Sequence, residues 1–146
     1  MDDYYDLGAY ERAITTSSPQ AQRWFDRGLN WLYGFNHTEA IACFGKALES
    51  DPDCAMAHWG ISYAAGPNYN LPWVLYDPAG KAQALRESYD AMQRALAVAA
   101  NATPVEQALI RALDIPIVGD VLRPDLGISS VSSMSGGLVA GAVQVE

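Results

Sequence analysis

Hydrophobic residues recur with a helical period along most of the chain and divide it into five predicted helices. The first helix is expected to begin after Ser18 with Pro19, because a serine cap followed by proline is a common helix start. It should run to about Gly34. Its large apolar residues share one helix face and predict a single buried stripe, made of Trp24, Gly28, Trp31 and Phe35.

Cap residues and prolines mark the starts of four more helices. These helices are predicted over residues 39–50, 53–65, 78–100 and 105–113. Their start signals are Asn36 with Glu39, Asp51–Pro52, Asp77–Pro78, and a capping box from Thr103 to Glu106. Pro116 is expected to close the fifth helix, because proline cannot donate a backbone hydrogen bond.

These elements predict an all-α fold of antiparallel helix hairpins. Residues 1–18 are interpreted as an extended N-terminal lead-in and residues 19–114 as the helical domain. Residues 115–146 are rich in serine, glycine and β-branched residues and show no helical stripe. That tail is predicted to be irregular: a short hairpin, a segment lying loosely on the helices, or a disordered stretch.

A repeat frame from Ala21 to Cys54 has the length of one tetratricopeptide repeat (TPR). Small and large residues fall in it at the offsets of that repeat: Trp24, Gly28, Trp31, Ala40, Phe44, Ala47 and Pro52. Arg27 stands where the repeat usually has leucine. The chain therefore resembles the TPR family, with one clear repeat, one divergent repeat and a half.

The resemblance extends from about Asp3 to Leu113 and is to the N-terminal part of longer cytosolic TPR-domain proteins of fungi and bacteria. It implies a short superhelical solenoid that acts as a scaffold, and it brings no catalytic residues with it. The tail lies outside the resemblance. We therefore keep a truncated or rearranged short form without function as one alternative.

Composition and charge narrow the classes of partner. The formal net charge is −8, which argues against nucleic acid and against an anionic membrane surface. The start of the chain has no basic and apolar leader, and no apolar run is long enough to span a bilayer. Two cysteines do not make a disulfide framework, so a cytoplasmic protein with free thiols is expected.

The loop between the third and fourth predicted helices is the first candidate binding surface. It offers amides beside flat apolar side chains, a mixture that interfaces favour. Loops inserted into a repeat often lie on its binding face. The candidate residues are Asn68, Tyr69, Asn70 and Trp73. The alternative is that the aromatic residues fold back as a lid over the helix ends.

Polar residues on the first helix form a second candidate surface. In a TPR-like pair the first helix lines the concave side, which would bring Arg23, Arg27 and Asn30 into the groove. Arginine can clamp a carboxylate bidentately, so this face would suit an acidic peptide end. The alternative is a local ion pair with Asp26.

Metal binding is the weaker hypothesis. Cys54 and His58 are four residues apart on one helix face, a spacing that can chelate zinc, and His37 is the third candidate ligand. Two or three dispersed ligands do not make a site, so we expect structural roles and no cofactor. No Gly-x-Ser-x-Gly elbow or acid–base pair is visible, and we expect no catalytic residues.

The sequence as a whole predicts a non-catalytic TPR-like scaffold that binds a protein or peptide partner. With fewer than three complete repeats, an open solenoid end could be covered by a second copy of the chain. Besides a short form without function, the alternative is an accessory or enzymatic role in a metabolic pathway, metal-assisted through Cys54, His58 and His37.

Overall fold

The computed structural model describes residues 5–118, apart from the side chains of Trp73 and of residues 115–118. This part of the chain contains no β-strand, and the all-α prediction is confirmed. Its helices are α1 (Pro19–Tyr33), α2 (His37–Ser50), α3 (Ala55–Ala65), α4 (Pro78–Val98) and α5 (Pro104–Val118), with two 3-10 turns at Trp73–Leu75 and Ala99–Asn101. The predictions for residues 1–4 and 119–146 lie outside the described residues.

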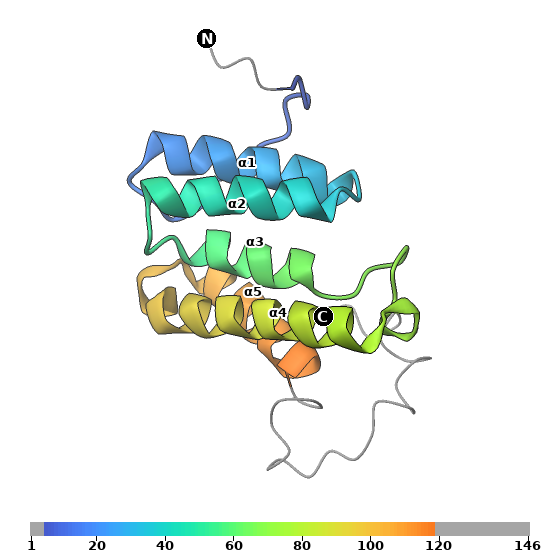
Figure 1. Ribbon diagram of the computed structural model, residues 1–146. Coiled ribbons are helices and arrows are strands. Elements are labelled where there is room, and N and C mark those ends of the chain that lie inside the picture. Colours follow the sequence, from blue (N-terminus) through green and yellow to red (C-terminus); the bar gives the residue numbers. More distant parts are fainter. Residues whose placement is uncertain (1–4, 119–146) are drawn as a thin grey trace, which may run out of the picture.

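The helices form two hairpins, and a fifth helix packs against the second hairpin (Figure 1). α1 packs along α2, and α3 packs along α4. α2 also contacts α3, which joins the two hairpins into one body. α5 contacts both α3 and α4, while α1 and α3 touch each other directly. The core therefore runs from α1 to α5 through α3.

The buried face of α1 is shifted by one residue from the predicted stripe. Its buried residues include Ala21, Phe25, Gly28, Leu29 and Leu32, so of the predicted stripe only Gly28 is fully buried. Both tryptophans of the stripe are half-buried at its edge, and its phenylalanine lies beyond the end of the helix. Spacing alone did not separate the two faces, because aromatic residues occur on both sides of this helix.

Phe44 of α2 is the centre of the packing between the hairpins. Its ring is fully buried. A Cβ placed on Gly28 of α1 or on Gly60 of α3 would lie within 2.9 Å of ring atoms, closer than carbon atoms pack. Both neighbouring helices therefore need glycine at the point where they meet this ring, as the small-and-large alternation in the sequence indicated for Gly28.

Two predicted helix boundaries are wrong. α3 begins at Ala55, and Asp51 is the C-cap of α2, because its amide bonds back to Ala47. α5 continues through Pro116 to Val118. The domain boundary at residue 114 stays a prediction.

The N-terminal lead-in has no regular secondary structure over residues 5–18, and it is docked on the helices. Ile14 packs against two parts of the hydrophobic core. The amide and hydroxyl of Thr15 both donate hydrogen bonds to the carboxylate of Glu106, which is only 3% exposed. The same carboxylate accepts hydrogen bonds from the amide and hydroxyl of Thr103 and completes the predicted capping box of α5. One buried carboxylate thus joins the lead-in to α5.

Candidate functional site

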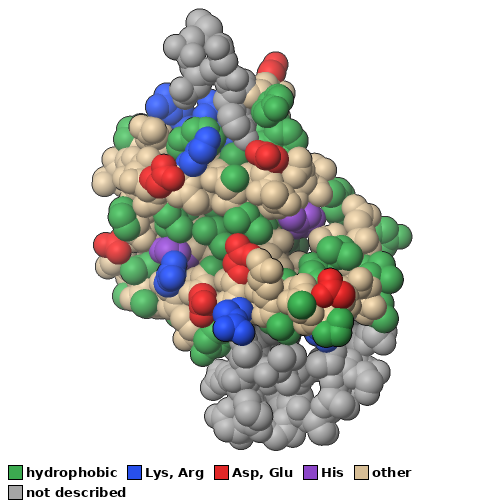
Figure 2. All heavy atoms as spheres, in the orientation of Figure 1, with side chains coloured by type: hydrophobic (Ala, Val, Ile, Leu, Met, Phe, Trp, Pro, Cys, Tyr) green, Lys and Arg blue, Asp and Glu red, His purple; other side chains and the backbone are tan. Residues whose placement is uncertain are grey.

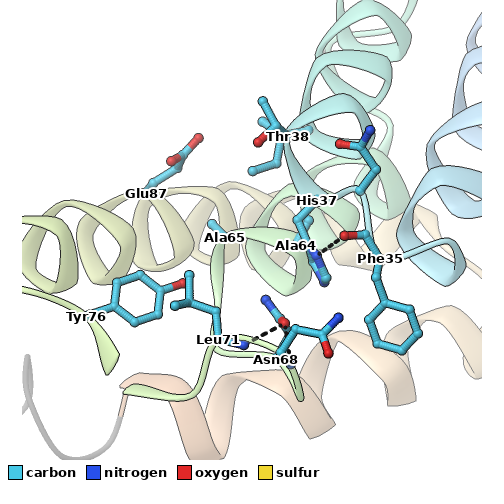
Figure 3. A pocket seen from close by; sticks show the side chains of 12 residues that line it. Phe35, His37, Thr38, Ala64, Ala65, Asn68, Leu71, Tyr76 and Glu87 are labelled. Atoms are coloured by element: carbon cyan, nitrogen blue, oxygen red, sulfur yellow. Dashed lines mark hydrogen bonds between the residues drawn. The ribbon is translucent and has the colours of Figure 1, made fainter. Parts of the chain in front are cut away.

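A pocket of about 390 Å³ opens where the turn between α1 and α2 faces the loop between α3 and α4. Its floor is apolar and includes Ile41 of α2 and the last residues of α3, Ala64 and Ala65. Figure 3 shows hydrogen-bonding groups at its sides, from the start of α2, from the loop and from α4. An apolar floor with a few convergent polar groups is the usual composition of a ligand site.

Phe35 lies at the rim of the pocket in an uncommon backbone conformation. Its φ is 60°, in the left-handed region that glycine usually occupies. The turn has the Schellman hydrogen bonds, from the amide of Phe35 to the carbonyl of Leu32 and from the amide of Asn36 to the carbonyl of Trp31. The phenyl ring is nevertheless 56% exposed. The turn that ends α1 thus accounts for the left-handed conformation and places Phe35 among the residues that line the pocket.

His37 follows on the same rim as the first residue of α2. Its Nδ1 lies 3.2 Å from the carbonyl oxygen of Phe35, and because a carbonyl only accepts, Nδ1 must carry the proton (Figure 3). In the neutral ring Nε2 is therefore an acceptor. His37 can accept a hydrogen bond from a ligand in the pocket.

The inserted loop forms the opposite wall of the pocket. Asn68 shapes it: its side-chain oxygen accepts hydrogen bonds from the amides of Asn70 and Leu71, and its backbone pairs with that of Leu71 (Figure 3). Asn68 and Asn70 both line the pocket, whereas Tyr69 is 90% exposed beside it. The prediction that Tyr69 folds back as a lid is wrong. The side chain of Trp73 lies outside the described residues.

Exposed apolar side chains concentrate around this wall. The loop contributes four of them, namely Tyr69, Leu71, Val74 and Leu75, and Phe35 stands on the other side of the pocket. The space-filling view shows hydrophobic side chains gathered on this side of the molecule (Figure 2). An exposed apolar patch beside a polar-lined pocket is typical of an interaction site.

Two further residues, Tyr76 and Glu87, add a hydroxyl and a carboxylate to the lining of the pocket. Tyr76 lies opposite Phe35 across the pocket (Figure 3), and burial raises the pKa of its hydroxyl, which is therefore a neutral donor or acceptor. Glu87 of α4 supplies the only carboxylate among the lining residues, and its side chain is exposed. Neutral groups thus predominate, with one anion at the edge.

The polar residues predicted on α1 lie away from this pocket and do not act together. Arg27 lies over the ring of Trp24, with the guanidinium carbon 4.5 Å from the ring centroid. Asn30 donates hydrogen bonds to the carbonyls of Tyr10 and Asp26, whereas Arg23 is exposed. The carboxylate of Asp26, which we considered as a local ion-pair partner, accepts hydrogen bonds from the amide of Arg12 and from the side chain of Gln22.

The three candidate metal ligands do not come together. His37 begins α2, whereas Cys54 and His58 lie beyond its other end, and Figure 2 shows the two histidines well apart. The ring Nε2 of His58 donates to the carbonyl of Pro52, and burial lowers the pKa of the ring. Burial also raises the pKa of the Cys54 thiol to about 11. Among residues 5–118, no three histidine, cysteine or acidic side chains group as a metal site.

The sequence thus indicated Asn68 and Asn70 on the loop side of the pocket, and on the other side only His37, as a candidate metal ligand. Phe35 was assigned to the buried stripe, and Tyr76 and Glu87 were not singled out. A left-handed residue after a helix is usually glycine, so nothing local marked Phe35 for this conformation. Gly34 has a φ of −78°. Tyr76 and Glu87 carry no local signal, because only the tertiary fold brings them to the pocket.

Comparisons with family models, with curated proteins and with solved structures found no match to this chain. In the described part of the chain, no helix is both long and apolar enough to cross a bilayer. The geometry of the pocket is therefore the basis for assigning a function.

Proposed function

We propose that the chain is a TPR-like helical-repeat protein that binds a peptide or protein partner, and that the pocket beside the inserted loop is the binding site. The repeat frame of the sequence supports the family. So does the order of contacts, since α1 touches α3 and α3 touches α5, as successive first helices do in a stacked array. Two buried free cysteines support a cytoplasmic location.

The pocket with its exposed apolar rim is the observation that carries the proposal. Tyr69 and Val74 place rings and methyl groups in solvent, which costs free energy unless a partner covers them. Within the pocket, the amides of Asn68 and Asn70 can form hydrogen bonds to peptide groups. A short peptide with one or two apolar side chains matches this combination of apolar floor and polar walls.

The test is a selection of peptides from a random library on the purified chain, followed by titration calorimetry of the best binder. We expect a Tyr69→Ala/Asn70→Ala variant to weaken binding by tenfold or more, because one well-placed aromatic contact and one hydrogen bond together contribute about 1.5–3 kcal/mol. Both side chains are exposed, so the variant should keep its fold.

Arg23→Ala is the matched control, because Arg23 is exposed on α1 away from the pocket. It should bind the selected peptide as the wild type does. Failure to select any peptide, or equal loss of binding in the control and in the loop variant, would contradict the proposal.

A further inference from the structure

We infer that the partner of the pocket is a peptide that carries an arginine and, close to it in sequence, an apolar residue. In this arrangement the guanidinium group lies against Glu87 and His37, and the apolar side chain lies on the floor of the pocket. The inference rests on the proposed function, because it names the side chains by which the pocket selects its peptide. It adds a requirement for positive charge that the proposed function does not contain.

The charge of the pocket is negative. Glu87 supplies a carboxylate, and among the described residues that line the pocket there is no lysine or arginine. One turn away from Glu87 on α4 lie Gln83, Ala84, Asp90 and Ala91. These neighbours add a second carboxylate and no cation. Because the whole chain also has a formal net charge of −8, a cationic ligand is attracted both by the pocket and by the field of the protein.

The hydrogen-bonding groups beside this carboxylate also suit a donor. The Nδ1 of His37 donates to the carbonyl oxygen of Phe35, 3.2 Å away, which leaves Nε2 of the neutral ring as an acceptor. The carboxylate of Glu87 only accepts. A guanidinium group has N–H donors in a planar fork and no acceptor. Two acceptors from different helices, α2 and α4, therefore match a group that only donates (Figure 3).

Two aromatic side chains favour arginine over lysine. Phe35 and Tyr76 lie on opposite sides of the pocket (Figure 3), and the ring of Phe35 is 56% exposed. The guanidinium group is flat and weakly hydrated and stacks on aromatic rings, whereas the ammonium group of lysine is compact and strongly hydrated. The pocket thus offers arginine a stacking surface in addition to its two acceptors.

The floor of the pocket sets the second requirement. It is formed by Ile41, Ala64 and Ala65, which leave apolar surface in water until a ligand covers it. Residues two positions apart in an extended peptide point to the same side of its backbone. An arginine and an aliphatic residue at that spacing can therefore enter the pocket together, the first at its acceptors and the second on its floor.

The experiment titrates the full chain with the tightest peptide from the random library, which we expect to contain this pair. The comparison peptide has citrulline in place of the arginine, because citrulline has nearly the same shape and no charge. Citrulline should weaken binding to the wild type by about tenfold or more, because hydrogen bonds between charged partners are about twice as strong as neutral ones. Lysine in place of the arginine should also weaken binding, because it loses the stacking.

Glu87→Gln tests the carboxylate, and Glu49→Gln is its matched control. Both side chains are exposed, and Glu49 lies in the last turn of α2, whereas the pocket lies at the first turn of that helix. In Glu87→Gln the change from arginine to citrulline should cost only about twofold, because the amide no longer distinguishes the charged from the neutral group. Glu49→Gln should show the full loss, although it changes the net charge equally. Circular dichroism checks that both variants keep their helices.

Three results would overturn the inference and leave the proposed function standing. They are a tightest peptide that depends on the loop residues but has no arginine, equal binding of the arginine and citrulline peptides, and an equal citrulline loss in the two glutamine variants. Equal binding of the lysine peptide would overturn the choice of arginine. If no peptide is selected, or if Tyr69→Ala/Asn70→Ala binds as the wild type does, the proposed function fails and this inference fails with it.

Discussion

Phe44 is held between two glycines, and replacing one of them with alanine tests the packing that joins the hairpins. A Cβ on Gly28 would lie 2.5, 2.6 and 2.9 Å from three atoms of the Phe44 ring. The ring cannot move away from Gly28 toward α3, because it already lies close to Gly60. A Cβ built on Gly60 would be 2.8 Å from atoms of the ring. Gly28→Ala must therefore move a helix.

The expected magnitude follows from two opposing effects. Overpacking of a close-packed core costs about 1–3 kcal/mol. Alanine in place of glycine within a helix regains about 1 kcal/mol of helix propensity. Gly28→Ala should therefore lower the free energy of unfolding by about 1 kcal/mol. Gly45 is the matched control, since it lies within α2 and a Cβ there would meet nothing within 4 Å. Gly45→Ala should raise the free energy of unfolding by about 1 kcal/mol.

Urea denaturation followed by circular dichroism at the helical band measures both variants. The difference of about 2 kcal/mol between the two alanine variants is large compared with the error of the method. In a Phe44→Leu background the smaller side chain leaves room, so the cost of Gly28→Ala should shrink by about 1 kcal/mol. If Gly28→Ala stabilises the chain as much as Gly45→Ala does, the close contact with Phe44 does not exist in solution.

Three further predictions follow from backbone strain and burial. Phe35→Gly should raise the free energy of unfolding by about 0.5–1 kcal/mol in urea, because glycine adopts a positive φ without strain, and it should weaken a peptide bound in the pocket. The Cys54 thiol, with its pKa raised to about 11 by burial, should react with a thiol reagent at pH 8 only after denaturant is added. Acid should lower stability in two steps. Because burial lowers the pKa of His58 in the folded state, stability should fall as pH drops below about 6.5, the ordinary value of the ring. Burial alone would raise the pKa of Glu106, but hydrogen bonds from Thr15 and Thr103 outweigh burial and lower it, so a second loss should begin below about 4.5 and be absent in Glu106→Gln. Melting temperatures measured from pH 8 to pH 3 check both steps.

The helices were predictable because their signals are local. Ser18, Asn36 and Asp77 each cap the helix that the sequence assigned to them, with the side-chain oxygen accepting from a first-turn amide. Thr103 and Glu106 form the expected capping box. A cap needs only its own residue and the next three, so the sequence contains the whole motif.

The buried face of α1 was harder to predict because it depends on a partner helix. Trp24 and Trp31 are the largest apolar side chains of α1, yet the partner surface admits Phe25 and Leu29 instead. Trp24 lies at the edge, where Lys46 stands 4.2 Å from its ring centroid and Arg27 also stacks on it. An indole ring can be half-buried under cations at little cost, so size does not decide which residue enters the core.

The lead-in shows why the polar side of α1 was only partly interpretable. The binding of a peptide by Asn30 stays a prediction; in the structure its side chain donates a hydrogen bond to the carbonyl of Tyr10 in the same chain. The sequence of the lead-in shows no periodic signal for this contact. Gln22, Asp26 and Asn30 form hydrogen bonds to its backbone groups, which are present whatever the side chains are. Between these backbone contacts, the side chains of Glu11 and Ala13 are exposed. The lead-in is held by its side chains only further along, where Ile14 packs against the core and the hydroxyl of Thr15 donates a hydrogen bond to Glu106.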